Sequence, residues 1–175
     1  MNRAVSGAGG VLKQGAGTVF VTAANSYLGG TAITGGTLNA NADTAFGGAA
    51  GTVALSNGAV LQAGGPLTMN RAFALGTGGG TIDTNGSTVT LGATSAISGT
   101  SLTKAGGGIL NITGAQTYAA LTTTGGVTNL MTDFGDGLPF TGEPEKLGAP
   151  ALVPEPGALG LLMVGALGVL GRRRP

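Results

Sequence analysis

The chain of 175 residues contains no cysteine, no histidine and no tryptophan, and aromatic residues make up only 4% of it. Without cysteine or histidine, the protein has no thiol or imidazole nucleophile, no histidine general acid or base, and no disulfide framework. Zinc and transition-metal sites built from nitrogen and sulfur ligands are excluded for the same reason. We therefore expect no catalytic residue, no metal site and no cofactor.

Charged residues are also scarce, at 9% of the chain, whereas an ordinary soluble domain carries roughly a quarter. Only four cations, scattered along the chain, precede Leu130, and a groove for phosphate backbones requires clustered lysine and arginine. The sequence therefore predicts no nucleic-acid partner. The charged residues of this region are Arg3, Lys13, Asp43, Arg71, Asp83 and Lys104.

Residues 1–129 are rich in glycine, threonine, alanine and asparagine. Short alternating apolar runs recur along them, bounded by glycine or by Asn-Gly pairs such as Asn57-Gly58 and Asn85-Gly86, and this pattern is typical of short strands joined by tight turns. Gly76-Thr77-Gly78-Gly79-Gly80 lacks the spacing of a dinucleotide-binding loop and is predicted to be a turn. The clearest predicted strands are Thr18–Thr22, Thr52–Leu55, Thr88–Leu91 and Ile109–Ile112.

This region is internally repeated. The segment from Lys13 to Thr22 matches the segment from Lys104 to Thr113 at an offset of 91 residues, and Tyr27 matches Tyr118 at the same offset. Because one coil of a solenoid takes roughly 20–25 residues, the offset corresponds to about four coils, and the region holds about five or six. We predict an all-β fold, a right-handed parallel β-helix, with aliphatic residues inward and glycines at the corners.

The motif Lys-x-Gly-x-Gly-x-Val-x-Val-Thr-x-Ala-Asn-x-Tyr-x-Gly-Gly-Thr-x-Ile-x-x-Gly-Thr-Leu runs from Lys13 to Leu38. It resembles the autotransporter-associated β-strand repeat. The second copy, from Lys104 to Asn129, departs from it where Ala119-Ala120-Leu121 replaces Gly29-Gly30-Thr31. The resemblance implies a secreted β-helical stalk and no particular activity, since function is carried by sites and not by folds.

Residues 130–152 have a different composition. Prolines and glycines alternate with four acids, Asp133, Asp136, Glu143 and Glu145, without apolar periodicity. Such a segment is typical of an exposed linker. The acids could bind calcium weakly, but they lack the spacing of an EF-hand loop, so a solvated acidic linker is the favoured interpretation.

Residues 153–175 form a third region. Val153-Pro154-Glu155-Pro156 precedes an uncharged segment, residues 157–171, which the arginines Arg172, Arg173 and Arg174 follow. As a helix, the uncharged segment would be about 22 Å long, shorter than a hydrocarbon core of about 30 Å. Snorkelling arginines and local thinning can accommodate the difference. We predict a short transmembrane helix over residues 157–171, with the arginines on the cytoplasmic side.

This C-terminal arrangement resembles the PEP-CTERM sorting signal of Gram-negative bacteria. The matching positions, and the sorting residues that we predict, are Val153, Pro154, Glu155, Pro156, Arg172, Arg173 and Arg174. The resemblance implies export, an inner-membrane intermediate, cleavage near Pro154–Pro156 by an exosortase-type membrane transpeptidase, and a final place at the cell surface or outside the cell. It also links such proteins with extracellular polysaccharide and biofilm matrix.

The start of the chain departs from this expectation. An exported protein is expected to begin with a basic stretch, an apolar segment and a cleavage site, whereas Met1–Val5 runs directly into the repeat region. We expect the natural start to lie upstream, so that the sequence is an N-terminally truncated fragment.

Two alternatives remain open beside a non-enzymatic stalk or adhesin. The first is a surface protein anchored permanently by an uncleaved tail, which would retain Arg172–Arg174. The second is a carbohydrate-active β-helix enzyme, which would need two acids at roughly 5–9.5 Å. Asp43 and Asp83 are the only acids before Leu130, and Asp83 is more simply a turn residue. Tyr27 and Tyr118 are expected to pack at corners, although a carbohydrate contact is the alternative.

Overall fold

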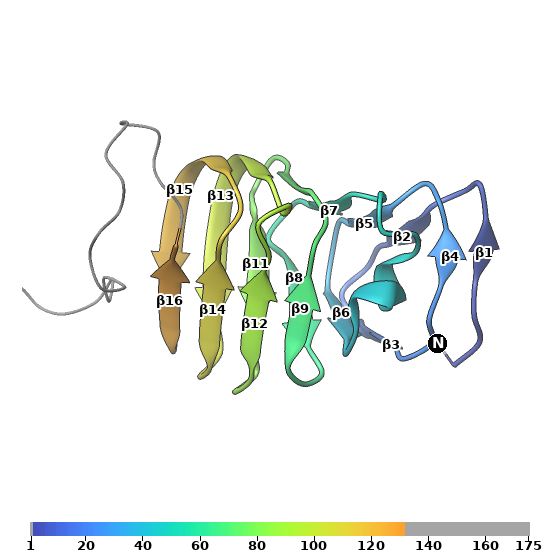
Figure 1. The fold of residues 1–175 in the computed structure, drawn as a ribbon, viewed down its shortest axis with the longest axis horizontal. Coiled ribbons are helices and arrows are strands. Elements are labelled where there is room, and N and C mark those ends of the chain that lie inside the picture. Colours follow the sequence, from blue (N-terminus) through green and yellow to red (C-terminus); the bar gives the residue numbers. More distant parts are fainter. Residues whose placement is uncertain (1, 132–175) are drawn as a thin grey trace, which may run out of the picture.

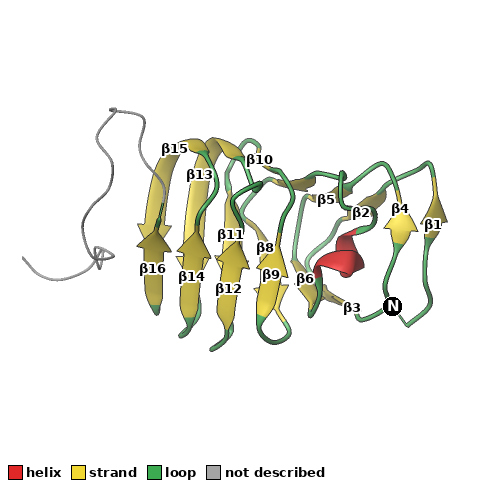
Figure 2. Cartoon of the chain, viewed as in Figure 1, coloured by secondary structure: helices red, strands yellow, loops and turns green. Residues whose placement is uncertain are grey.

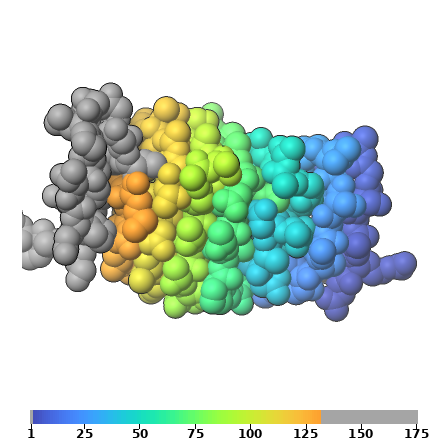
Figure 3. Space-filling model, in the orientation of Figure 1, coloured from blue at the N-terminus to red at the C-terminus, as the bar shows by residue number. Residues whose placement is uncertain are grey.

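The structure is a computed structural model that describes residues 2–131. These residues form an all-β parallel solenoid of about six turns, whose successive coils lie along one axis (Figures 1 and 3). This confirms the predicted fold class and the predicted number of coils. The predicted membrane helix over residues 157–171 lies outside the described residues.

The strands of the described coils lie on three faces. Face 1 contains β1 (Ser6–Gly7), β4 (Ser26–Tyr27), β9 (Leu67–Met69), β12 (Thr88–Leu91), β14 (Ile109–Ile112) and β16 (Val127–Leu130). Face 2 contains β2 (Val11–Lys13), β5 (Thr31–Ile33), β7 (Val53–Leu55), β10 (Phe73–Leu75) and the first parts of β13 (Ile97–Ala105) and β15 (Gln116–Thr123). Face 3 contains β3 (Thr18–Val21), β6 (Thr37–Ala40), β8 (Ala59–Ala63), β11 (Gly80–Asp83) and the second parts of β13 and β15.

Every pair of neighbouring strands is parallel, because each strand hydrogen-bonds to the equivalent strand of the next coil. Paired residues are separated in the sequence by 18 residues between Leu110 and Thr128 and by 24 between Phe73 and Ile97. The coil length therefore follows from the spacing of the apolar runs. The predicted strands at Thr88–Leu91 and Ile109–Ile112 are confirmed with the same bounds.

The core is a set of inward rows that cross from coil to coil. On face 2, the row runs Lys13, Ile33, Leu55 and Leu75. On face 3, the equivalent row runs Leu38, Leu61, Ile82 and Lys104. Each aliphatic member is buried and contributes about 1.5–3 kcal/mol by leaving water. Two lysines thus occupy positions that leucine or isoleucine fills elsewhere in the same rows.

A 3₁₀ helix, η1 (Asp43–Phe46), takes the place of a strand on face 1 (Figure 2). It lies between β4 and β9, so face 1 is divided into a two-stranded and a four-stranded sheet. Phe46 and Ala45 point into the core from this helix and are buried. Among the described coils, one has no strand on face 1, and these two side chains fill the interior there.

The internal repeat is visible in the backbone. Gly7 and Gly99 have φ angles of 127° and 117°, Gly15 and Gly106 have 72° and 76°, and Gly36 and Gly126 have 64° and 70°. Following the strand pairing through four coils from Lys13 leads to Gly99, in the first part of β13, and Lys104 lies in the second part of the same strand. The offset of 91 residues therefore spans four coils and one additional face, and the two copies lie on adjacent faces.

Candidate functional site

The predicted sorting residues lie outside the described residues. This applies to Val153–Pro156, to Arg172–Arg174 and to the four acids of the linker. Between residues 2 and 131, no helix is long and apolar enough to cross a bilayer. Among the described residues, the side chains that could bind a ligand or take part in a reaction are the buried cations, the two acids and the outward polar rows of the solenoid.

Arg71 is the most heavily bonded side chain of the described region. It lies in the turn between β9 and β10, and it is 2% exposed. Its Nε donates to Oδ1 of Asp43 at 2.6 Å, which forms a salt bridge. Its Nη1 and Nη2 donate to the carbonyl oxygens of Asp43, Phe46, Gly47, Gly48 and Gly51 at 2.8–3.4 Å.

These contacts join the turn before β10 to the segment that replaces a strand. The segment from Asp43 to Gly51 leaves several carbonyl oxygens outside the strand ladder, and a buried carbonyl without a donor is costly. The five-donor fork of arginine suits several acceptors at once. The guanidinium carbon also lies 5.6 Å from the centre of the Phe46 ring. Arg71 therefore fixes η1 and the loop after it.

The two repeat lysines make equivalent contacts with carbonyl oxygens at two corners. Nζ of Lys13 donates to the carbonyl oxygens of Gln14, Gly15 and Gly35 at 2.7–3.0 Å. Nζ of Lys104 donates to those of Ala105, Gly106 and Gly125 at 2.6–2.9 Å, and also contacts Oγ1 of Thr84 at 2.8 Å. Each ammonium group therefore joins two successive coils at a glycine corner.

The glycine after each acceptor corner is required by its backbone and by the neighbouring coil. Gly36 and Gly126 have positive φ angles, and a Cβ at Gly36 would lie 2.4 Å from the carbonyl oxygen of Gly15, while one at Gly126 would lie 2.1 Å from that of Gly108. Lys104 is fully buried. Burial lowers the pKa of Lys104 below its usual value, and the nearby carboxylate of Asp83 opposes this shift.

The structure does not bring Asp43 and Asp83 together. Asp43 lies on η1 on face 1, while Asp83 ends β11 on face 3. Asp43 is bound to Arg71, and Asp83 accepts the backbone N–H of Asn85 at 2.8 Å. Asp83 is therefore the last residue of a strand, and its carboxylate bonds to the turn that follows. The paired acids of a glycoside hydrolase are not formed by these two residues. Within residues 2–131, no group of three or more acids is placed to hold a metal ion.

Two outward polar rows cross the strands of faces 3 and 1. On face 3, Nδ2 of Asn39 donates to Gln62, and Nε2 of Gln62 donates to Asp83, each at 2.9 Å. On face 1, Nδ2 of Asn129 donates to Asn111 at 2.8 Å. Such side-chain bonds between directly opposed residues stabilise a sheet.

The two tyrosines differ in their surroundings. Tyr27 is buried, and its hydroxyl bonds to Oγ1 of Thr31 at 2.6 Å, which confirms the predicted corner packing. Tyr118 lies within β15, packs against the edge of the core and donates to Oε1 of Gln116. Burial raises the pKa of Tyr118.

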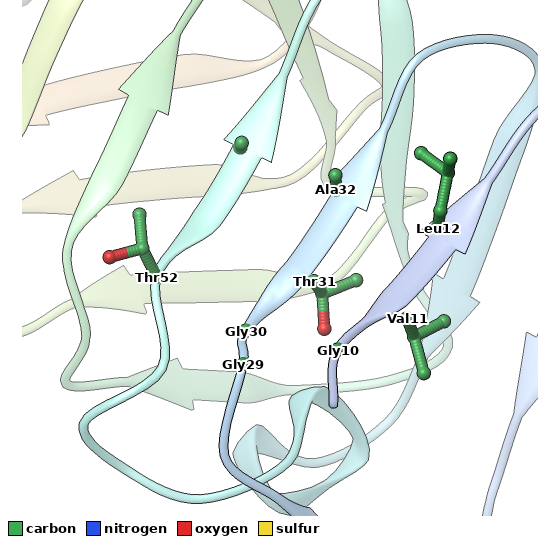
Figure 4. Close-up of a pocket in the computed structure, with 9 residues that line it drawn as sticks. Gly10, Val11, Leu12, Gly29, Gly30, Thr31, Ala32 and Thr52 are labelled. Carbon is green, nitrogen blue, oxygen red and sulfur yellow. The ribbon is translucent and has the colours of Figure 1, made fainter. Parts of the chain in front are cut away.

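A shallow depression of about 350 Å³ lies on face 2 (Figure 4), over strands β2, β5 and β7. Its glycines are explained by packing between coils. A Cβ at Gly10 would lie 2.8 Å from the carbonyl oxygen of Gly29, and a Cβ at Gly30 would lie 2.6 Å from that of Thr52. The depression therefore reflects the close approach of backbones.

Sequence reasoning missed the roles of Arg71 and of the two lysines. For the lysines, a signal was present, because both begin the matching repeat segments at positions that are followed by glycines. For Arg71, the partner Asp43 lies 28 residues away, and no sequence pattern connects the two.

Comparisons with known proteins agree with this geometry. The Passenger-associated-transport-repeat family matches residues 11–40 and 102–128, the segments that contain Lys13 and Lys104. The PEP-CTERM protein-sorting motif matches residues 152–174, which include all the predicted sorting residues. The chain therefore carries two passenger-associated transport repeats and a C-terminal sorting motif, and it is an exported surface protein.

One curated relative is the adhesin BmaC autotransporter of Brucella suis biovar 1 (strain 1330). It is 39% identical to this chain in an alignment of 135 positions that covers 70% of the chain. The chain spans only 4% of the length of that relative. No solved structure matches the chain.

Proposed function

We propose that this protein is a non-enzymatic surface stalk or adhesin whose C-terminal signal is cut by an exosortase-type membrane transpeptidase. The observation that carries the proposal is the combination of a sorting motif over residues 152–174 with a solenoid built from passenger-associated repeats. The relative named an adhesin supports the adhesive role. An extracellular polysaccharide is the proposed partner outside the cell.

The solenoid suits a spacer, because the parallel ladders of faces 2 and 3 continue through the described coils. The neighbouring coils are joined by strand pairing, by the carbonyl contacts of Lys13 and Lys104, and by the Arg71 network. In such a solenoid each coil stacks on its neighbours, so the molecule extends along one axis. The two acids of the repeat region are held by other groups, which favours a structural role over catalysis.

The test of processing is the intact mass of the protein recovered from its native cells and medium. We expect a mature protein that lacks about twenty residues at the C-terminus, the part after the Pro-Glu-Pro box in removable signals of this type. A mature protein that retains Arg172–Arg174 would support the permanently anchored alternative. A full-length protein found only in the cytosol would contradict export.

Changing Pro154 and Pro156 together to alanine is expected to leave the tail attached. Proline lacks a backbone donor and disfavours helix in the residue before it, so the box stays extended and accessible at the membrane face. Intact mass and an immunoblot against the tail would measure cleavage. Pro150→Ala is the matched control, because Pro150 lies outside the matched motif. Normal cleavage of the double variant would contradict recognition through this box.

A further inference from the structure

Four outward residues of face 3 form a row across neighbouring strands, the face 3 strip. Phe20 lies opposite Asn39, Asn39 lies opposite Gln62, and Gln62 lies opposite Asp83. Since neighbouring strands are about 4.7–4.9 Å apart, the strip is about 14 Å long. It crosses β3, β6, β8 and β11 along the solenoid axis.

The polar members of the strip are held by hydrogen bonds that run in one direction. Asn39 donates to Gln62, Gln62 donates to Asp83, and Asp83 also accepts the backbone N–H of Asn85. These bonds fix the side chains in one arrangement. These side chains are already ordered in the folded protein, so binding a ligand to the strip costs little additional conformational entropy.

The internal bonds leave part of the hydrogen-bonding capacity unused. An amide nitrogen has two N–H groups, an amide oxygen has two lone pairs, and a carboxylate has about four acceptor positions. Gln62 therefore retains one donor and one acceptor position, and Asp83 retains about two acceptor positions. Both side chains are half-buried and reach solvent. A hydroxyl group can both donate and accept a hydrogen bond, so hydroxyl groups complement these unused positions.

An aromatic ring stands at one end of the strip. Phe20 is 59% exposed, so much of its apolar surface faces solvent next to the amide of Asn39. Sugar rings have the complementary form, with an apolar C–H face and hydroxyls around the edge. The strip carries one carboxylate and no cation, so its electrostatics oppose a polyanion.

We infer that the face 3 strip binds a neutral glycan chain that lies along the solenoid axis. Phe20 stacks on one sugar ring, while Gln62 and Asp83 hydrogen-bond to the hydroxyls of a ring further along, and Asn39 positions Gln62. The inference rests on the proposed surface role, since it gives the proposed polysaccharide partner a binding site on the solenoid.

The test is affinity electrophoresis of the full chain in gels that contain hydroxyethyl cellulose, a neutral glycan, or alginate, an anionic one. We expect hydroxyethyl cellulose to retard the wild type, and alginate to retard it much less. Phe20→Ala and Gln62→Ala are each expected to weaken binding about tenfold, the effect of losing one contact or hydrogen bond of this kind. Thermal melting followed by circular dichroism confirms that each variant is folded.

The matched control is Asn111→Ala on face 1, which breaks a polar row of similar chemistry. It should bind hydroxyethyl cellulose as the wild type does. The inference is overturned if the neutral glycan does not retard the wild type, if Phe20→Ala and Gln62→Ala bind normally, or if Asn111→Ala loses binding equally. A chain that binds the glycan through this strip but is never cleaved would contradict the processing proposal and leave the binding site standing.

Discussion

Replacing Arg71 with methionine is expected to lower the free energy of unfolding by about 3–5 kcal/mol, the range for removing one member of a buried ion pair. The variant keeps the apolar stem and loses all six hydrogen bonds of the guanidinium. Asp43 and the carbonyl oxygens of the loop that ends at Gly51 would then lack their donor. Urea denaturation followed by circular dichroism measures the change.

Two control variants show whether the loss of stability comes from breaking the hydrogen bonds of Arg71 or only from removing a positive charge. Arg3→Met removes an exposed arginine and should change the free energy of unfolding by less than about 0.5 kcal/mol. Asp43→Asn keeps an Oδ1 acceptor for Nε of Arg71 and leaves the five carbonyl contacts of the guanidinium in place, so it should cost less than Arg71→Met. A loss for Arg71→Met no larger than that for Arg3→Met would contradict the role of Arg71 in fixing η1.

Hydrogen exchange gives the location of the effect. Because a solenoid is stabilised mainly by contacts between neighbouring coils, we expect protection to fall first at the backbone bonds near η1. Examples are the bond from Asn25 N to Thr44 O and the bond from Gly48 N to Tyr27 O. Uniform loss of protection over the whole solenoid would indicate global destabilisation without a local role.

The fold could be predicted because its determinants are local and repeated. A run such as Thr88–Leu91, with alternating inward residues and the Asn85-Gly86 turn before it, defines both a strand and a corner. Repetition of such runs at the length of one coil leaves few arrangements other than a solenoid. The number of coils and the strand positions followed from the same spacing.

The substitution of a strand by η1 could not be predicted, because it depends on a tertiary contact. Asp43–Phe46 has neither the length nor the periodicity of a helix. It is stabilised by Arg71, which is distant in the sequence and buried only after the following coil has formed. Likewise, the sequence match between Lys13 and Lys104 did not indicate that both side chains point inward.

Replacing Lys104 with methionine is expected to lower the free energy of unfolding by about 2–4 kcal/mol, since the ammonium group donates to several buried acceptors and leaving them unpaired is costly. Methionine fits a core position, because Lys104 stands in an inward row with Ile82 and Leu61. Lys13→Met, at the equivalent corner, loses three carbonyl contacts from a side chain that is 6% exposed. A smaller loss is expected there.

The difference in free energy of unfolding between the wild type and Lys104→Met should depend on pH if the buried ammonium group of Lys104 titrates. Burial lowers the pKa of Lys104 in the folded protein, whereas in the unfolded chain it is near 10.4. Between these two pKa values the unfolded chain binds more protons, so the stability of the wild type rises with pH across that window. Lys104→Met lacks this gain, while the raised pKa of Tyr118 affects both proteins alike. The difference in free energy of unfolding between wild type and variant should therefore be larger at pH 10.5 than at pH 7. A constant difference would mean that Lys104 keeps its ordinary pKa, with the carbonyl oxygens and Asp83 offsetting the whole effect of burial.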